Sequence, residues 1–437
     1  MAATPTHSPR SSHHEEDHHN TSTSAVDQDQ ENSPLGLLVS DVAPDGGLRA
    51  WLVAGGAAAI FLSTLGLGNS FGAFESYYLR HQLSSESESK IAWIGSLQSF
   101  LQFFSGMLGG PLFDRYGSLV IYPSAAAYVL AIMILSLCTN YWQTMLVQGV
   151  LMGIVMGFLQ IPAFAAVSQH FDKKRAAALG ITVSGSSIGG IIMPIILSKM
   201  LNGSNLGFAW TVRVIGFVIL PFMVFACIVV KPHLPPRKAQ LFWTPYKQPR
   251  FLMLVAALFF MFIGMFTPFF YLPIYATTHG MSTTLAGYLL AMINATSTLG
   301  RIIPGILADK YGRLNIFALG GITTGIVIFC MTCATTNAGL IVYALFFGFT
   351  SGAIISGASA AFASCPSDAR DMGTYMGMGM AIAGLGALIG PPINGAILEA
   401  YGGYLRVSMF SGALAVFGGV LAFAAKFGTE GGILGRV

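Results

Sequence analysis

Apolar runs of about 20 residues recur through most of the chain, and each is long enough to cross roughly 30 Å of hydrocarbon as a helix. We predict twelve spans, at residues 51–78, 91–113, 119–138, 143–169, 176–198, 208–230, 251–276, 285–307, 314–334, 338–362, 373–398 and 404–425. Only 9% of the 437 residues are charged. A soluble domain carries about 25% charged residues, because its surface faces water. The composition therefore predicts an all-α membrane protein with twelve transmembrane helices.

Two polar stretches divide the chain. Residues 1–48 are rich in Ser, Thr, His and acidic residues, a composition typical of a disordered tail. Residues 231–250 hold five prolines and five basic residues between the sixth and seventh spans. We therefore predict six-helix bundles at 49–230 and 251–425, joined by this linker and followed by a short tail at 426–437.

The basic residues predict the orientation in the membrane. With the N-terminus in the cytoplasm, 16 of the 22 Lys and Arg residues fall on the cytoplasmic side and five on the opposite side. Lys and Arg collect in cytoplasmic loops of membrane proteins. We therefore expect both termini in the cytoplasm, and the plasma membrane as the location.

Two segments that lie six spans apart repeat each other. Gly110–Leu119 reads GPLFDRYGSL, and Gly305–Leu314 reads GILADKYGRL. A second set of matches pairs Gly180, Gly189 and Pro194 with Gly377, Gly386 and Pro391. Two parallel six-helix halves imply a pseudo-two-fold axis along the membrane normal and a solute site near the midplane between them. The repeat therefore predicts a secondary transporter that works by alternating access.

The repeated GxxxD[RK]YG sequence resembles the loop motif of the major facilitator superfamily. In that family the motif lies between spans two and three and recurs between spans eight and nine, as it does here. We expect the carboxylates to face helix N-termini and the basic residues to hold the cytoplasmic ends together in one state. The alternative is that Arg115 and Lys310 only follow the positive-inside rule. The predicted conformational switch comprises Gly110, Asp114, Arg115, Gly305, Asp309 and Arg313.

Two further stretches resemble the signatures of the monocarboxylate transporter family in its fungal form. One is DGGLRAW at Asp45–Trp51, and the other is HFDKKRAAALGITVSG at His170–Gly185. This resemblance implies facilitated or proton-coupled movement of small organic acids, and its fungal branch includes exporters found beside secondary-metabolite pathways. The signature residues are Asp45, Gly46, Trp51, Lys173, Arg175 and Gly185.

The match to that family is incomplete at two positions. Animal members carry a lysine late in the first span, where this chain has Asn69. They also carry an aspartate one turn before an arginine in the eighth span. Here the arginine is Arg301, and Ser297 takes the place of the aspartate. The acid–base pair that would carry a proton is therefore incomplete.

Arg301 is the sharpest candidate for a site residue. An arginine within a span is costly and usually faces the bundle interior or a water-filled cavity, and its planar fork can bind a carboxylate. The alternative is that its side chain snorkels to the cytoplasmic end of the span, about 9 Å away. The other candidates for substrate binding or gating are Asn69, Asn294, Glu75, Tyr271 and Asn394. Their alternative roles are bonds between helices for the asparagines and interfacial positions for the other two.

The chain has no P-loop motif. Its one HExxH match, at His14–His18, falls in the tail predicted to be disordered, and its two GxSxG matches, at Gly68–Gly72 and Gly185–Gly189, fall inside predicted membrane spans. We therefore expect no enzyme activity, no catalytic residue, no metal and no cofactor, with energy drawn from a gradient. We expect a secondary active or facilitative transporter of a small organic solute that bears a carboxylate. The alternative is efflux of a fungal secondary metabolite, and a remote one is a non-transporting sensor. The expected partners are the solute, protons as a candidate coupling ion and the lipid bilayer, with no nucleic acid; an accessory membrane protein is left open.

Overall fold

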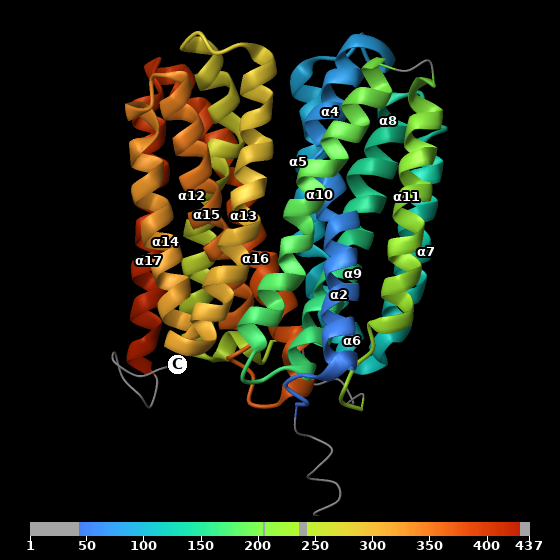
Figure 1. Ribbon diagram of the computed structural model, residues 1–437, viewed down its shortest axis with the longest axis vertical. Helices are drawn as coiled ribbons and strands as arrows, with labels where there is room; N and C mark the ends of the chain where they lie inside the picture. The colour runs from blue at the N-terminus through green and yellow to red at the C-terminus, as the bar shows by residue number, and fades with distance from the viewer. Residues whose placement is uncertain (1–42, 204–205, 236–242, 429–437) are drawn as a thin grey trace, which may run out of the picture. The chain divides into compact units, whose positions relative to one another are not determined.

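The computed structural model describes residues 43–203, 206–235 and 243–428. Within these ranges the chain is helical and contains no strand (Figure 1). The tail predicted over residues 1–48 lies outside the described residues up to residue 42. The first helix already begins at Gly47, with Gly46 as its N-cap, so it starts just inside the predicted boundary of the tail.

The helices fall into two groups. The N half comprises α2 (Gly47–Ser63), α3 (Leu65–Gly68), α4 (Phe71–Tyr77), η1 (Tyr78–Gln82), α5 (Glu88–Phe104), α6 (Gly106–Tyr116), η2 (Gly117–Val120), α7 (Ile121–Leu135), α8 (Tyr141–Thr144), η3 (Met145–Met152), α9 (Gly153–His170), α10 (Arg175–Gly203) and α11 (Gly207–Val229). The C half comprises η4 (Pro245–Lys247), α12 (Pro249–Thr278), α13 (Thr283–Tyr311), α14 (Arg313–Phe329), η5 (Cys330–Cys333), α15 (Asn337–Phe362), η6 (Ala369–Asp371), α16 (Met372–Tyr401), α17 (Tyr404–Ala424) and η7 (Ala425–Gly428).

Eleven helical stretches of the described chain are long and apolar enough to cross a membrane, so the predicted all-α membrane fold is confirmed. The stretch Lys90–Leu135 has 46 residues, which is about 69 Å of helix at 1.5 Å per residue. One crossing needs only about 20 residues. The stretch breaks where α6 ends and Gly117 takes a φ of +59°. It therefore supplies both the second and the third predicted span.

Each half packs mainly on itself. In the N half α10 packs on α2 and α3, and α11 packs on α2 and α7; in the C half α13 packs on α15, and α12 and α14 pack on α17. The halves meet where α10 faces α13 and where α5 and α6 face α16. Figure 1 shows α2 beginning and α17 ending at the same side as the end of α6. We call this side, where the two repeated motifs lie, the motif side, and the opposite one the far side.

Small residues let α10 lie directly against the first crossing. A Cβ on Gly185 would collide with the carbonyl oxygen of Ala58. One turn later, a Cβ on Gly189 would come 2.7 Å from the Cα of Gly66. Such close approach of backbones is how small residues stabilise helix pairs in a membrane. The face of α10 that carries Gly185 and Gly189 therefore packs within the N half.

Candidate functional site

The first crossing is broken near its middle. α2 ends at Ser63, the single turn α3 follows, and α4 starts at Phe71. Asn69 ends α3 at this break and is exposed. In transporters, broken helices lie where backbone groups face protein or a water-filled cavity, not lipid. The surroundings of Asn69 are therefore a candidate solute site.

Asn69 of the N half and Asn294 of the C half both lie beside Gly190 of α10. A Cβ placed on Gly190 of α10 would lie 3.0 Å from the amide nitrogen of Asn69 and 2.9 Å from the amide oxygen of Asn294 on α13. Asn294 is buried, and its amide N–H donates to the Leu290 carbonyl at 2.9 Å. Two predicted site residues from opposite halves are thus brought together at the α10–α13 contact.

Arg301 lies seven residues, or two turns, after Asn294 on the same face of α13. It is 4% exposed, and its Nη1 donates to the Val183 carbonyl at 2.8 Å and to the Ser186 hydroxyl, both on α10. Its Nε is buried without a hydrogen-bond partner. In the described part of the chain, no carboxylate pairs with Arg301. A buried cation without an acid partner is costly, so its charge is available to an anionic ligand.

The geometry of Arg301 does not fit snorkelling. α13 continues ten residues beyond it, to Tyr311, which is about 15 Å of helix at 1.5 Å per residue. The side chain crosses to α10 instead of following its own helix to the motif side. It therefore lies inside the contact between the halves.

Asp114, near the end of α6, caps a helix of the C half. Its Oδ1 accepts a hydrogen bond from the Gly373 N–H at 3.0 Å, and its Oδ2 accepts from the backbone N–H and the hydroxyl of Thr374, both at 2.7 Å. These donors belong to the first turn of α16, where unpaired N–H groups and the helix dipole favour negative charge. Gly110 permits the approach, since a Cβ there would collide with the carbonyl oxygen of Gly373.

Asp309 repeats this arrangement in the opposite direction, from α13 to the N half. Its Oδ1 and Oδ2 accept hydrogen bonds from the N–H groups of Ala176 and Ala177, at 3.0 and 2.8 Å, in the first turn of α10. Gly305 lies alongside, and a Cβ there would come 2.7 Å from the Ala176 carbonyl oxygen. The two carboxylates of the repeat each join one half to the other at the motif side.

The basic residues of the repeat behave differently from our expectation. Arg115 and Lys310 each lie over the ring of the tyrosine that follows them, at 5.1 and 5.3 Å from its centroid, and within the described residues neither bonds to the opposite half. Successive side chains on a helix point about 100° apart, so a residue that follows an inward carboxylate points away. Arg313 does cross: its Nη2 donates to the Asp172 carbonyl, and its Nε lies 3.5 Å from Asp309 Oδ1.

The loop between α15 and α16 completes the contact at the motif side. The Nη1 of Arg175, at the start of α10, donates to the Ala363 carbonyl at 3.0 Å. In the same loop, Arg250 Nη2 donates to the Ser364 hydroxyl at 3.3 Å. Burial raises the pKa of the neighbouring Cys365 thiol to about 11. Because the thiolate is the reactive form, this thiol reacts slowly while the motif side is closed.

The two signature stretches lie against each other. Asp45 accepts hydrogen bonds from backbone N–H groups of the segment that contains Lys173, whose own side chain is exposed. The rings of Trp51 and Phe171 lie 4.9 Å apart. The first stretch ends at Trp51 and the second begins at His170, 119 positions later, so their contact is a tertiary one.

Asn394 is part of a buried polar triangle within the C half. Its Nδ2 donates to Thr267 Oγ1 at 2.7 Å, its Oδ1 accepts from Ser411 Oγ at 3.0 Å, and the two hydroxyls are 2.7 Å apart. All three residues are fully buried, on α16, α12 and α17. Both ends of the amide are therefore used to join helices, which is the alternative role given above for an asparagine within a span.

We expect Asn394→Ala to lower the free energy of unfolding by about 1–2 kcal/mol, because two buried hydrogen bonds between helices are lost. The thermal unfolding midpoint of the purified protein measures this. Ser96→Ala is the control, since the Ser96 hydroxyl is exposed and bonds only to its own helix. An unchanged midpoint combined with loss of transport would instead favour a direct role for Asn394 in binding solute.

Tyr271 and Glu75 lie on the far-side parts of α12 and α4. The Tyr271 hydroxyl donates to the Pro391 carbonyl of α16 at 2.8 Å, so it bonds within the C half. Glu75 is half-buried and follows the break of the first crossing. The structure thus brings Asn69, Asn294 and Arg301 to one contact between the halves, and leaves Tyr271 within the C half.

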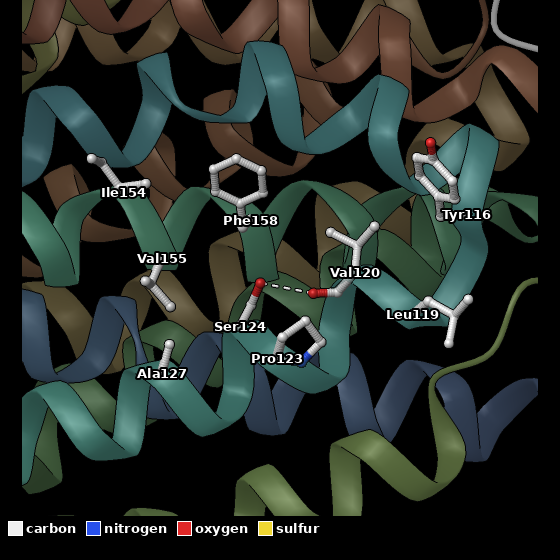
Figure 2. Close-up of a pocket in the computed structure, with 9 residues that line it drawn as sticks. All are labelled: Tyr116, Leu119, Val120, Pro123, Ser124, Ala127, Ile154, Val155 and Phe158. Carbon is white, nitrogen blue, oxygen red and sulfur yellow. Dashed lines mark hydrogen bonds between the residues drawn. The ribbon is translucent and has the colours of Figure 1, made fainter.

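An apolar groove of about 560 Å³ lies entirely within the N half (Figure 2). Its wall holds two hydroxyls, that of Tyr116 and that of Ser124, and the Ser124 hydroxyl donates to the Val120 carbonyl at 2.7 Å. No residue of the C half lines the groove, so it does not belong to the contact between the halves. Its walls are formed by Tyr116, Leu119, Val120, Pro123, Ser124, Ala127, Ile154, Val155 and Phe158.

Sequence reasoning passed over two sets of polar groups near the site. Gln160 Nε2 donates to Thr64 Oγ1 at 2.9 Å, and that hydroxyl donates to the Ile60 carbonyl at 2.7 Å, beside the break. Ser186 is the partner of Arg301. A glutamine inside a predicted span is a usable signal. The serine is not, because most hydroxyls in these spans bond only to their own helix.

Two packed helical halves, joined by reciprocal carboxylate caps and by a polar contact at mid-helix, define a multi-pass membrane transporter. A sequence profile described as Major Facilitator Superfamily matches residues 56–305 and 294–433. The chain belongs to the Major Facilitator Superfamily.

Relatives and solved structures agree with this assignment. Aspyridones efflux protein apdF of Emericella nidulans is 50% identical over 388 residues, which is 89% of this chain and 80% of that protein. Agnestins efflux protein AgnL12 of Paecilomyces divaricatus is 38% identical over 88% of this chain and 89% of its own. The crystal structure of the human organic anion transporter MFSD10 (TETRAN) shares the fold with a TM-score of 0.69 at 14% identity, over 86% of this chain and 100% of that one. The transporter FucP, solved in the outward conformation, gives 0.66 at 15% identity, over 84% and 98%.

Proposed function

We propose that this protein exports a small organic product of secondary metabolism by alternating access. The observation that carries the proposal is the pair of reciprocal carboxylate caps, which close the motif side by joining each half to a helix N-terminus of the other. Rigid-body rocking of the halves can break and re-form these contacts, because each consists of a few hydrogen bonds at helix ends. In this proposal the motif side is cytoplasmic, as the distribution of Lys and Arg suggests.

Export is favoured over uptake by the names of two relatives. Both apdF and AgnL12 are described as efflux proteins, and their similarity extends over nearly the whole of this chain. The proposal does not extend to their particular compounds, since specificity depends on a few side chains around the solute.

The proposed solute site lies between Asn69, Asn294 and Arg301. The asparagines offer neutral donors and acceptors, and Arg301 offers a charge that no carboxylate of the described residues pairs with. This set suits a solute with one acidic group and several neutral polar groups. Uptake of an organic acid, which the resemblance to monocarboxylate transporters implies, is the second candidate, and Arg301 is the observation that favours it.

Untargeted mass spectrometry of cells and medium tests the direction of transport, by comparing a strain that lacks the protein with its parent. We expect a compound to accumulate in the cells of the deletion strain and to fall in its medium. Restoring the gene should reverse both changes. Failure of the deletion strain to remove an organic acid from the medium would support uptake instead, and identical profiles under several growth conditions would contradict both candidates.

A further inference from the structure

The segment that leads into α2 binds the segment that leads into α10. Asp45 Oδ1 accepts hydrogen bonds from the backbone N–H groups of Asp172 at 2.6 Å and Lys173 at 2.7 Å, with the Lys174 N–H at 3.5 Å. The Asp45 N–H in turn donates to the His170 carbonyl at 3.1 Å. One carboxylate oxygen thus organises the whole turn between α9 and α10.

The backbone at this position is held against its preference. Asp45 has a φ of +53°, a left-handed conformation that few residues other than glycine adopt, although Asp and Asn are tolerated. The ring contact between Trp51 and Phe171, at 4.9 Å, ties the next turn of α2 to the same segment. The two contacts together make residues 45–51 a strap across the motif-side end of α10.

The turn between α9 and α10, which Asp45 binds, also makes hydrogen bonds with the C half. Arg313, from the C half, donates to the Asp172 carbonyl. Arg175 is oriented by the same turn, because its Nε donates to the Phe171 carbonyl at 2.8 Å and its Nη2 to Asp172 Oδ1 at 3.1 Å. Its third nitrogen, Nη1, is then placed to reach Ala363 in the C half.

Two carboxylates therefore bind backbone amides on either side of Arg175, where α10 begins. Asp45, from the same half, binds the N–H groups of residues 172–174, and Asp309, from the other half, binds those of Ala176 and Ala177. When the motif side opens, the bonds of Asp309 must break, whereas those of Asp45 lie within one half and can persist. The strap can thus keep the receiving end of α10 in shape between cycles.

We propose that Asp45 is a positioning residue of the motif-side gate, which we define as the contacts made by Asp114, Asp309, Arg175 and Arg313 between the halves. This inference rests on the proposed function, since a gate matters only if the halves move. Asp45 fixes the conformation of the turn before α10. The Asp172 carbonyl and the Arg175 guanidinium are therefore already in position to bond to the C half when the motif side closes. Loss of this preorganisation raises the fraction of molecules with an open motif side.

The C half fastens its corresponding helix in another way. Gln248, just before α12, donates from Nε2 to the Tyr375 hydroxyl at 2.6 Å, and the Tyr246 hydroxyl donates to the Met378 carbonyl at 3.0 Å. These neutral groups bind α16 within its first two turns and leave its first N–H groups to Asp114. The turn before α16 is capped by its own Asp368, whose Oδ1 accepts from the Arg370 N–H at 2.9 Å, whereas the turn before α10 is bound by Asp45 from a separate segment of the chain. Removal of Asp45 should therefore affect the α10 end of the gate.

The experiment measures the distance across the motif side by double electron–electron resonance, on the full chain in lipid nanodiscs without added solute. Spin labels at Leu119→Cys and Tyr311→Cys report opening, since both residues are exposed on the motif side, one in each half. The five native cysteines are replaced first. We expect Asp45→Gly to raise the ratio of open to closed molecules about threefold, a fraction of the effect of losing a helix cap. Glycine removes the carboxylate without opposing the positive φ.

Asp45→Asn separates positioning from general damage. All the hydrogen bonds that the Asp45 side chain accepts go to Oδ1, and an amide oxygen can accept the same bonds. We therefore expect Asp45→Asn to restore most of the closed population, and Glu86→Gln, on the far-side surface, to leave it unchanged. An unshifted distance distribution in Asp45→Gly would overturn the inference, as would equal shifts in the glycine and asparagine variants. Because no solute is needed, failure of the transport test leaves this result interpretable.

Discussion

Asp114→Asn lowers the transport rate about tenfold or more, while the protein still reaches the membrane. The carboxylate accepts bonds on both oxygens, from the N–H of Gly373 and from the N–H and hydroxyl of Thr374. An amide has only one acceptor oxygen, so its NH₂ group would face a backbone donor. A hydrogen bond to a charged group contributes about 1.5–3 kcal/mol, and 1.4 kcal/mol is tenfold in an equilibrium constant. The fraction of molecules with a closed motif side should therefore fall.

Maleimide labelling of Cys365 measures the opening directly, in a variant that keeps Cys365 and lacks the other four cysteines. Burial raises the pKa of this thiol to about 11 in the closed form. Opening exposes the thiol and returns its pKa toward the ordinary value, so more thiolate is present at pH 7 and labelling accelerates. We expect the labelling rate to rise in Asp114→Asn in parallel with the loss of transport.

Glu399→Gln is the matched control, because Glu399 is an exposed acid on the far-side half of α16. It should change neither the labelling rate nor transport. Asp309→Asn should reproduce the Asp114 result, since both oxygens of Asp309 also accept backbone N–H groups. Normal transport with unchanged labelling in Asp114→Asn would show that its cap does not control the motif side.

The sequence predicted the features that depend on length and repetition. A run of about 20 apolar residues must be a membrane helix, and one offset of 195 residues aligned Asp114 with Asp309. Since both carboxylates follow the same motif, the same physical reason applies to each: an acid near a helix N-terminus is stabilised. The geometry agrees with that reasoning at both ends, although their effect on transport stays a prediction.

Features that depend on contacts between helices could not be predicted from apolar length or from the internal repeat. Apolar length is unaffected by the break at Thr64, so the run predicted at 51–78 looked continuous. Asn69 and Asn394 were equivalent in the sequence, as polar residues within spans. In the structure Asn69 lies at the break of the first crossing, whereas Asn394 is hydrogen-bonded to Thr267 and Ser411. The direction in which a side chain points decides such cases, and a one-dimensional pattern does not contain it.

Arg301→Gln lowers the affinity for an anionic solute about ten- to a hundredfold, which corresponds to losing a hydrogen-bonded charge worth about 1.5–3 kcal/mol. Glutamine keeps an N–H donor for the Val183 carbonyl or the Ser186 hydroxyl, so the contact between the halves can persist without the charge. The dissociation constant of the purified protein for the compound found by mass spectrometry measures the effect. Thermal stability should not fall, because a buried cation without an acid partner is replaced by a neutral group.

Arg301→Ala and Arg301→Lys complete the comparison. Alanine removes both the charge and the bonds to α10, whereas lysine keeps the charge and loses the planar fork that binds a carboxylate through two hydrogen bonds. If Arg301 binds the solute, lysine retains part of the affinity and glutamine and alanine lose it equally. If Arg301 only holds α13 against α10, glutamine binds normally and alanine alone is defective, and the proposed solute site would have to be moved away from this contact.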